Sequence, residues 1–189
     1  MRIGILGGTF NPIHLGHLIL AEEAIDLVGL EKIIFIPCYI PPHKSSKGII
    51  QAAARLKMVN LAIGSNARFS VSDIEAKVKR KSYTINTLRA LKKVFPMHTD
   101  FFLIVGSDAL EELPRWKNFK EIQKLAKVIV AVRPGFKAAK KQYTNKLIKI
   151  SQLGISSSDI RMRVKKGFSI RYLVPDKVEG YIRRNSLYR

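Results

Sequence analysis

The stretch GGTFNPIHLGHL, residues 7–18, decides the predicted fold. It follows an apolar run at residues 3–6 and leads into apolar residues with helical spacing that continue to Ile25. Glycines let a ligand approach the backbone, and a helix start presents N–H groups with a partial positive charge. The stretch therefore predicts a strand, a phosphate-binding loop and a helix.

His14 and His17 lie three residues apart at the expected helix start, so they share one face and can reach the same polyanion. Gly16 between them leaves room for that ligand. The two commoner phosphate loops, GxxxxGK[ST] and GxGxxG, are absent here, which argues against a P-loop ATPase and an NAD-binding dehydrogenase. An ordinary tight turn with two surface histidines is the alternative, but it fits this combination of residues less well.

Apolar runs and helical patterns alternate along the chain. We expect strands at residues 2–6, 32–37, 68–71, 100–105 and 127–132, and helices at 15–28, 52–63, 84–95, 119–125 and 176–184. This alternation predicts a Rossmann-like α/β fold with a doubly wound parallel sheet, in which ligands bind beyond the carboxyl ends of the strands. We expect a single domain, with the core sheet in residues 1–135 and a small, basic, helical portion in residues 136–189.

The composition indicates a globular protein, with 47% hydrophobic and 25% charged residues. No apolar run reaches the length of a membrane span, and the N-terminus lacks a signal-peptide pattern. Cys38 is the single cysteine, which excludes an internal disulfide and suits a reducing compartment. We therefore expect a cytoplasmic protein without membrane association; a homo-oligomer is compatible with the sequence.

The net charge of +20 is unevenly distributed, because residues 133–189 hold 15 Lys and Arg against 3 Asp and Glu. Such a bias can mark a nucleic-acid surface, serve anionic small substrates or maintain solubility. The basic residues alternate with apolar ones in helical patterns, so we favour a folded, solvated basic face over nucleic-acid binding.

After the second expected strand the chain reads PCYIPPHK, residues 37–44. The prolines stiffen this loop and cannot extend a sheet. His43 and Lys44 therefore follow a stiff segment, where they can close over phosphates. From these residues alone, two solvated surface side chains are the simpler interpretation.

Polar residues also occur at other strand ends and helix starts. Ser82 and Thr84 suit the N-cap of the third helix, whose first N–H groups attract an anion. Gly106 and Asp108 follow the fourth strand, where the carboxylate can accept hydrogen bonds from ribose hydroxyls or cap a short helix. These residues add candidate ligand contacts at the same edge of the sheet.

The second half of the chain offers further candidates. Trp116 is flanked by Pro, Arg and Lys, which is unlike a central core position. Arg133 ends the fifth strand and would project over the ligand-binding edge. Ser156–Ser158 supply a helix cap, and Arg161 follows one turn later, which predicts a second anion site or, alternatively, only a capped basic helix.

Taken in order, these motifs resemble those of the H-x-G-H nucleotidyltransferase superfamily, and within it the nicotinate mononucleotide adenylyltransferase family. The resemblance implies transfer of AMP from ATP to nicotinic acid mononucleotide, giving nicotinic acid adenine dinucleotide and pyrophosphate, a step of NAD biosynthesis. It implies catalytic roles for His14 and His17. It implies ATP contacts from Gly7, Gly8, Thr9, Phe10, His14, Gly16, His17, Gly106, Asp108, Arg133, Ser156, Ser157 and Arg161. It implies nicotinate-nucleotide contacts from His43, Lys44, Ser82, Tyr83, Thr84 and Trp116.

The sequence departs from the family's pattern at three positions. Asn86 stands where members usually have Asp, Lys117 where they often have an aromatic residue, and Ser158 where they have Thr. The serine keeps the hydroxyl of the threonine it replaces. The first two departures bear on recognition of the pyridine nucleotide.

The motifs offer no close pair of carboxylates, so we expect no protein-held metal and Mg²⁺ carried on the ATP phosphates. The nearest alternative activity is a sister adenylyltransferase that uses nicotinamide mononucleotide or phosphopantetheine. More distant alternatives are an RNA-binding module, a class I tRNA ligase fragment, whose KMSKS signature is missing, and a metal site from His14, His17, His43 and Cys38, whose spacing matches no common pattern.

Overall fold

A computed structural model describes residues 1–42, 47–64, 66–132, 143–151 and 153–189. Within these residues, strands β1 (Arg2–Gly8), β2 (Lys32–Pro37), β3 (Phe69–Val71), β4 (Asp100–Gly106), β5 (Lys127–Val132) and β6 (Lys146–Lys149) form a six-stranded sheet in the order β3-β2-β1-β4-β5-β6. Each strand runs parallel to its neighbours. The strand order reverses between β1 and β4, which is where ligands bind in doubly wound sheets.

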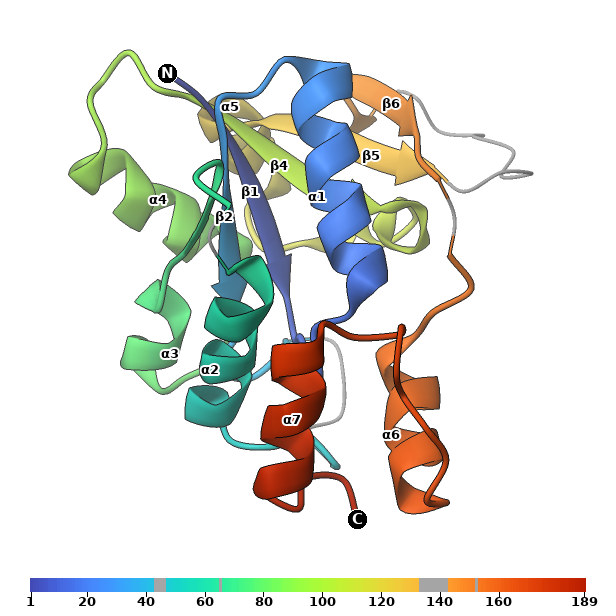
Figure 1. Ribbon diagram of the computed structural model, residues 1–189. Coiled ribbons are helices and arrows are strands. Elements are labelled where there is room, and N and C mark those ends of the chain that lie inside the picture. Colours follow the sequence, from blue (N-terminus) through green and yellow to red (C-terminus); the bar gives the residue numbers. More distant parts are fainter. Residues whose placement is uncertain (43–46, 65, 133–142, 152) are drawn as a thin grey trace.

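Helices cover both faces of this sheet (Figure 1). They are α1 (Leu15–Val28), α2 (Ala52–Ile63), α3 (Ile74–Val78), α4 (Thr84–Val94), α5 (Phe119–Leu125), α6 (Ser157–Lys165) and α7 (Asp176–Arg184), together with the 3-10 turns η1 (Ser107–Ala109) and η2 (Leu113–Arg115). Alternate strand residues point to opposite faces, so Leu6 joins a hydrophobic cluster with α1, α2, α6 and α7, whereas Ile5 joins another with α4 and α5. The predicted doubly wound α/β fold is confirmed.

The sheet continues beyond the boundary expected at residue 135. Strand β6 pairs with β5 inside the segment expected to be a basic helical portion. Its sequence, KLIK, has lysines at both ends and a buried Ile148, so its apolar run is too short to stand out. The same cluster that contains Leu6 also contains Ile160 and Ile182, so the C-terminal helices share the core of the sheet.

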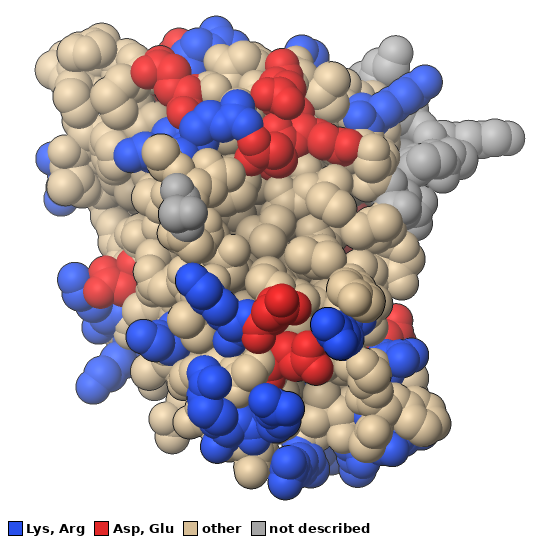
Figure 2. All heavy atoms as spheres, viewed as in Figure 1, with Lys and Arg blue, Asp and Glu red and all other residues tan. Residues whose placement is uncertain are grey.

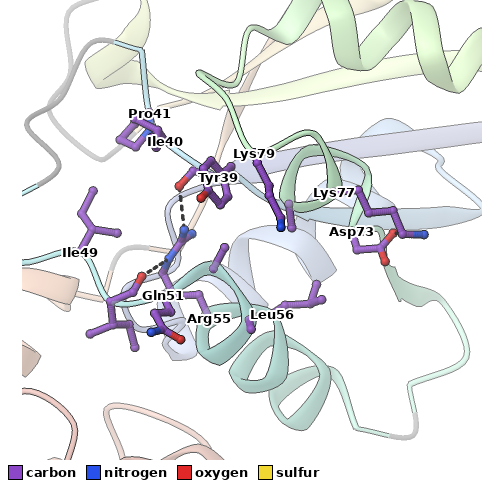
Figure 3. A pocket seen from close by; sticks show the side chains of 14 residues that line it. Tyr39, Ile40, Pro41, Ile49, Gln51, Arg55, Leu56, Asp73, Lys77 and Lys79 are labelled. Atoms are coloured by element: carbon purple, nitrogen blue, oxygen red, sulfur yellow. Dashed lines mark hydrogen bonds and ion pairs between the residues drawn. The ribbon is translucent and has the colours of Figure 1, made fainter.

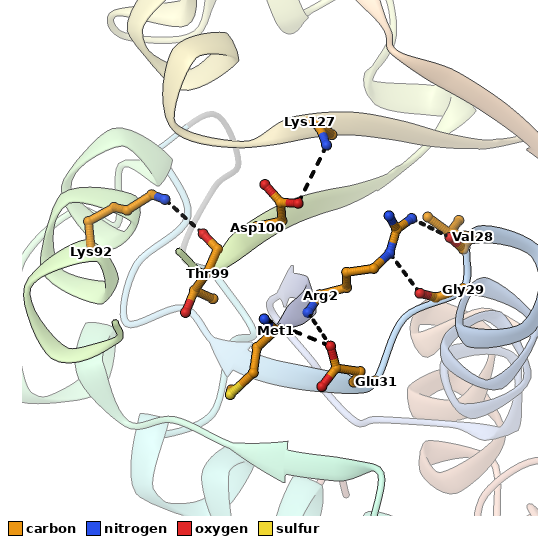
Figure 4. A network of polar contacts seen from close by, with 9 residues as sticks. All are labelled: Met1, Arg2, Val28, Gly29, Glu31, Lys92, Thr99, Asp100 and Lys127. Atoms are coloured by element: carbon orange, nitrogen blue, oxygen red, sulfur yellow. Dashed lines mark hydrogen bonds and ion pairs between the residues drawn. The ribbon is translucent and has the colours of Figure 1, made fainter. Parts of the chain in front are cut away.

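Polar contacts close the end of the sheet where the strands begin (Figure 4). The Arg2 guanidinium donates to the carbonyl oxygens of Gly29 and Val28, both at 2.8 Å, and lies over the Phe102 ring. The Arg2 N–H donates to Glu31. These contacts fix the C-terminus of α1 against the sheet and leave the opposite end, where β1 points toward α6 and α7, for ligands (Figure 1).

Basic side chains gather toward that opposite end. Figure 2 shows Lys and Arg outnumbering Asp and Glu over the lower part of the visible face, the part occupied by α2, α6 and α7 in Figure 1. The resulting positive potential attracts anions to the carboxyl ends of the strands. Among the described residues, no helix has both the length and the apolar character needed to cross a bilayer.

Candidate active site

Two exposed glycines form an open stretch of backbone at the point where the strand order reverses. Gly7 is the last residue but one of β1 and Gly106 ends the neighbouring β4, and a Cβ atom added to either would meet nothing within 4 Å. Gly8 is different, because its Cβ would lie 2.9 Å from the ring of Phe10. Gly7 and Gly106 therefore leave space for a ligand, whereas Gly8 makes space for Phe10.

The buried Phe10 ring packs against His17. Its ring is 2% exposed, packs edge-on against the His17 ring with centroids 5.0 Å apart, and contacts Phe35. Its φ of 47° lies in the left-handed region, which is uncommon for a residue with a side chain. The predicted ATP contact of Phe10 can therefore involve only its main chain, while the ring orients His17.

The two histidines lie together, as their spacing predicts, and their rings stack on each other. Their ring centroids are 3.7 Å apart with an interplanar angle of 29°. The main-chain N–H of His14 donates to Nδ1 of His17 at 3.2 Å, which fixes the neutral His17 ring with its proton on Nε2. Gly16 permits this packing, since its Cβ would lie 3.1 Å from Nδ1 of His14.

Burial keeps both rings neutral. It lowers the pKa of His14 from 6.5 to about 4. The pKa of His17 lies well below 6.5, chiefly because of burial and also because a protonated His14 would repel a second positive charge. In the described part of the chain, Nδ1 of His14 is buried without a hydrogen-bond partner. At neutral pH His17 therefore offers a neutral Nε2–H as a hydrogen-bond donor, and the nearly covered His14 ring packs behind it.

The second predicted anion site docks directly on the glycine loop. Ser156 caps α6 by accepting a hydrogen bond from the N–H of Asp159. The Ser157 hydroxyl donates to the carbonyl oxygen of Pro12 at 2.8 Å, and Nη1 of Arg161 donates to that of Asn11 at 2.9 Å. The structure thus brings the two predicted anion-binding motifs together, although Ser157 and Pro12 are 145 residues apart in the sequence.

Helix α1 begins directly after the glycine loop. Its first N–H, that of Leu15, donates to the carbonyl oxygen of Leu173, and the Leu18–Ile25 face packs into the core beside α7. Part of the predicted supply of N–H groups at this helix start is therefore already used within the protein. Among the described side chains here, those of His17 and Arg161 remain as candidate donors to a phosphate, since the Ser157 hydroxyl already donates its proton to Pro12.

The candidate pyridine site lies at the start of α4. The N-cap position is Tyr83, rather than Ser82 or Thr84 as the residue types suggest. Ser82 instead accepts a hydrogen bond from the N–H of Tyr39 at 2.9 Å, and so connects α4 to the loop after β2. Thr84 begins the helix and is partly exposed.

Trp116 lies in the same region. It is half-buried, packs with Tyr83 against the cluster that contains Ile5, and keeps its Nε1 without a partner in the described residues. Nζ of Lys117 lies 4.9 Å from the centre of the Tyr83 ring. The lysine at this unusual position therefore joins the two expected pyridine-binding segments through a cation–π contact.

Some predicted residues lie outside the described residues, or keep an untested role. His43, Lys44 and Arg133 belong to segments 43–46 and 133–142, so their contacts stay predictions. Asp108 is exposed in η1, directly after β4, and its contact with a ribose stays a prediction. Across the described ranges, no group of three or more His, Cys, Asp and Glu is placed to hold a metal ion.

Sequence reasoning missed the role of Asn11. Its amide donates to the carbonyl oxygen of Gly48 at 2.9 Å, and its Oδ1 accepts the hydroxyl of Tyr188 at 2.9 Å. Asn11 thereby ties the glycine loop to the segment before α2 and to the C-terminus. An asparagine directly before Pro12, inside the expected phosphate loop, was the signal available in the sequence.

Comparison with known proteins shows the family to which the chain belongs. The cytidylyltransferase-like family matches residues 5–163. A probable nicotinate-nucleotide adenylyltransferase of Desulfitobacterium hafniense (strain DSM 10664 / DCB-2) is 42% identical over 199 residues, covering 100% of this chain and 96% of the relative. The corresponding Enterococcus faecalis protein is 38% identical over 188 residues, covering 100% of this chain and 85% of the relative.

A solved structure shares the fold over the whole chain. The Plasmodium falciparum nicotinic acid mononucleotide adenylyltransferase complexed with NaAD superimposes with a TM-score of 0.80 at 23% identity, covering 99% of this chain and 97% of the other. This likeness shows the fold, and the curated relatives show the family. The chain therefore belongs to the cytidylyltransferase-like family and, within it, to the nicotinate-nucleotide adenylyltransferases.

Proposed function

We propose that the protein transfers AMP from ATP to nicotinic acid mononucleotide, releasing pyrophosphate and forming nicotinic acid adenine dinucleotide for NAD biosynthesis. The observation that carries this proposal is the convergence of the His17 ring, the open Gly7 backbone and the α6 residues Ser157 and Arg161 at the carboxyl edge of the sheet. The names of the curated relatives support the choice of substrates.

The reaction needs alignment and charge stabilisation more than proton removal. A phosphate oxygen of the acceptor attacks the α-phosphorus of ATP, a new P–O bond forms, and the bond to the bridging oxygen breaks with its electron pair going to pyrophosphate. The acceptor phosphate is already an anion at neutral pH, so no strong base is required. The protein's task is to hold two anions in line and to donate hydrogen bonds to the charge that develops.

We assign that donation chiefly to Nε2–H of His17. Its tautomer is fixed by the hydrogen bond at Nδ1, and its ring is held between His14 and Phe10, so the donor needs little reorganisation. Ser157 and Arg161 are placed to contact the triphosphate, and we propose that Mg²⁺ enters on its phosphates. The pyridine ring would stack on Trp116, with its carboxylate at the start of α4 near Thr84.

The choice of acceptor can be tested by comparing kcat/KM among three acceptors. We would follow pyrophosphate release from ATP with nicotinic acid mononucleotide, nicotinamide mononucleotide or phosphopantetheine as the acceptor. The proposal predicts the highest kcat/KM with the nicotinate compound. A higher kcat/KM with either other acceptor would contradict the proposed substrate and favour the sister activity.

The proposed setting is the cytoplasm. Cys38 is buried as a free thiol, which suits a reducing compartment. The basic surface near the site has a simpler use than nucleic-acid binding, since both substrates are polyanions.

A further inference from the structure

Arg55 of α2 occupies an unusual position for a charged residue. Of the Lys, Arg, Asp and Glu side chains that the structure describes, it is the one that is fully buried, at 1% exposure. Charged side chains are rarely buried to this extent unless their charge is compensated. Arg55 lies outside every motif that sequence patterns associate with the substrates, so its burial needs another explanation.

The guanidinium group is compensated by main-chain carbonyl oxygens from three segments. Nη1 donates to the carbonyl of Thr9 at 2.8 Å and to that of Cys38 at 2.6 Å, and Nη2 donates to that of Tyr39 at 2.9 Å. Nε donates to the carbonyl of Ile50 at 3.0 Å, just before the helix. Figure 3 shows the guanidinium reaching from α2 toward Tyr39, with dashed lines to two of these partners.

The two loops joined in this way belong to different substrates in the proposed reaction. Thr9 follows β1 in the glycine loop, which faces ATP, whereas Cys38 and Tyr39 follow β2 in the loop that leads to the acceptor side. Ser82 holds Tyr39 from the other direction, since its hydroxyl accepts the Tyr39 N–H at 2.9 Å. The loop after β2 is therefore fixed between Arg55 and the start of α4, where the pyridine ring is expected.

We propose that Arg55 is a positioning residue, which holds the ATP loop and the acceptor loop at a fixed separation so that the acceptor phosphate meets the α-phosphorus in line. This inference rests on the proposed function. A planar guanidinium has five N–H donors in a rigid fork, so one group can span carbonyls of two loops, whereas a lysine ammonium concentrates its donors at one point. Arg55 touches neither substrate in this scheme, and acts through the backbone at Thr9 and Tyr39.

The test compares Arg55→Gln with Met58→Ala. Met58 lies one turn further along α2 and is also fully buried, but it packs in the hydrophobic cluster and contacts no substrate loop by hydrogen bonds. Both changes lower the melting temperature, so kcat is measured well below melting and expressed per folded molecule. Misplacing reacting groups by about 1 Å costs roughly 10²-fold, and we expect Arg55→Gln to lower kcat about 30- to 100-fold while Met58→Ala stays within about threefold.

Separate binding measurements distinguish positioning from a general loss of structure. Each substrate is titrated alone by calorimetry, and the Kd of each should change by less than about fivefold in Arg55→Gln, since each loop keeps its own contacts. Arg55→Lys should recover part of kcat. Unchanged kcat in Arg55→Gln, or a loss of kcat matched by equal losses in both affinities, would overturn the proposal.

Hydrogen exchange tests the clamp without turnover, so its outcome stays separate from that of the proposed function. Peptides covering residues 6–14 and 36–42 should exchange faster in Arg55→Gln than in Met58→Ala. Equal exchange of these peptides in the two variants would refute the clamp, even if the parent protein turned over other substrates.

Discussion

Replacing His17 separates the roles of its two ring nitrogens. Nδ1 accepts the His14 N–H at 3.2 Å and serves the helix cap, whereas Nε2–H is the donor that we assign to the developing charge. Asparagine places a carbonyl oxygen near the position of Nδ1 but has nothing at Nε2. Glutamine places an N–H₂ group near the position of Nε2 but loses the cap. The pair therefore tests the donor and the cap independently.

The magnitude follows from the loss of one preorganised donor, which costs about 2.7 to 4 kcal/mol in the transition state, or about 10²- to 10³-fold in kcat. We expect this loss for His17→Ala and His17→Asn, and a smaller loss for His17→Gln. Because the neutral ring already carries the proton on Nε2, kcat of the parent protein should not fall between pH 6 and 8 through loss of a proton from His17.

The assay is continuous pyrophosphate release at saturating ATP and acceptor, with the folded fraction of each variant checked by circular dichroism. Retention of kcat within threefold in His17→Asn would remove the donor from the mechanism. An activity of His17→Gln no higher than that of His17→Ala would show that the cap, rather than Nε2–H, accounts for the effect.

Three other predictions concern His14, the paired glycines and Trp116. The pKa of His14 is lowered to about 4 in the folded state, so the unfolded chain binds the proton first and stability falls as the pH is lowered. Urea unfolding should show that the parent protein loses about 3 kcal/mol more stability between pH 7.5 and 4 than His14→Leu does, and an equal pH dependence in both proteins would contradict this. Gly8→Ala places a Cβ 2.9 Å from the Phe10 ring and should cost about 1 to 3 kcal/mol of stability. The Cβ of Gly7→Ala meets open space, so this variant should keep the melting temperature of the parent protein but bind ATP more weakly. Equal melting temperatures of the two variants would refute the contrast. Trp116→Ala should weaken binding of the acceptor by roughly 1 to 3 kcal/mol and leave the Kd of ATP nearly unchanged, so equal losses for both substrates would argue against stacking of the pyridine ring.

The elements that the sequence predicts best are those with a strong local pattern. Helices at 15–28 and 176–184 match the observed α1 and α7, because their apolar spacing and flanking residues are unambiguous. The edge strand β6 escapes prediction, since only Ile148 is buried and lysines surround it. Short α3 likewise buries no residue completely, so its pattern is weak.

The candidate site shows the same division between local and long-range information. The proximity of His14 and His17 follows from their i, i+3 spacing, and the cap at Ser156 follows from its residue type. The burial of Arg55 does not, because an arginine among alanines and leucines on a helix usually faces solvent. Its role depends on carbonyl groups contributed by loops 16 and 46 residues away, which no local pattern encodes.

Burial also changes the chemistry that the histidines bring. Two imidazoles near a polyanion suggest cations, yet the low pKa values of His14 and His17 make both rings neutral at pH 7. Positive charge in the region is instead supplied by side chains such as Arg161 and by the basic surface around α6 and α7. Anion attraction and hydrogen-bond donation are thereby assigned to different residues.

The most direct test of the account is a crystal structure with a non-hydrolysable ATP analogue. We expect the triphosphate over Gly7 and Gly106, with an α-phosphate oxygen within hydrogen-bond distance of Nε2 of His17. The obvious competing location is the cavity of about 590 Å³ between α2 and α3, lined by residues such as Ile49 and Lys79 (Figure 3). A nucleotide bound there, with the glycine edge empty, would contradict the assignment of the active site.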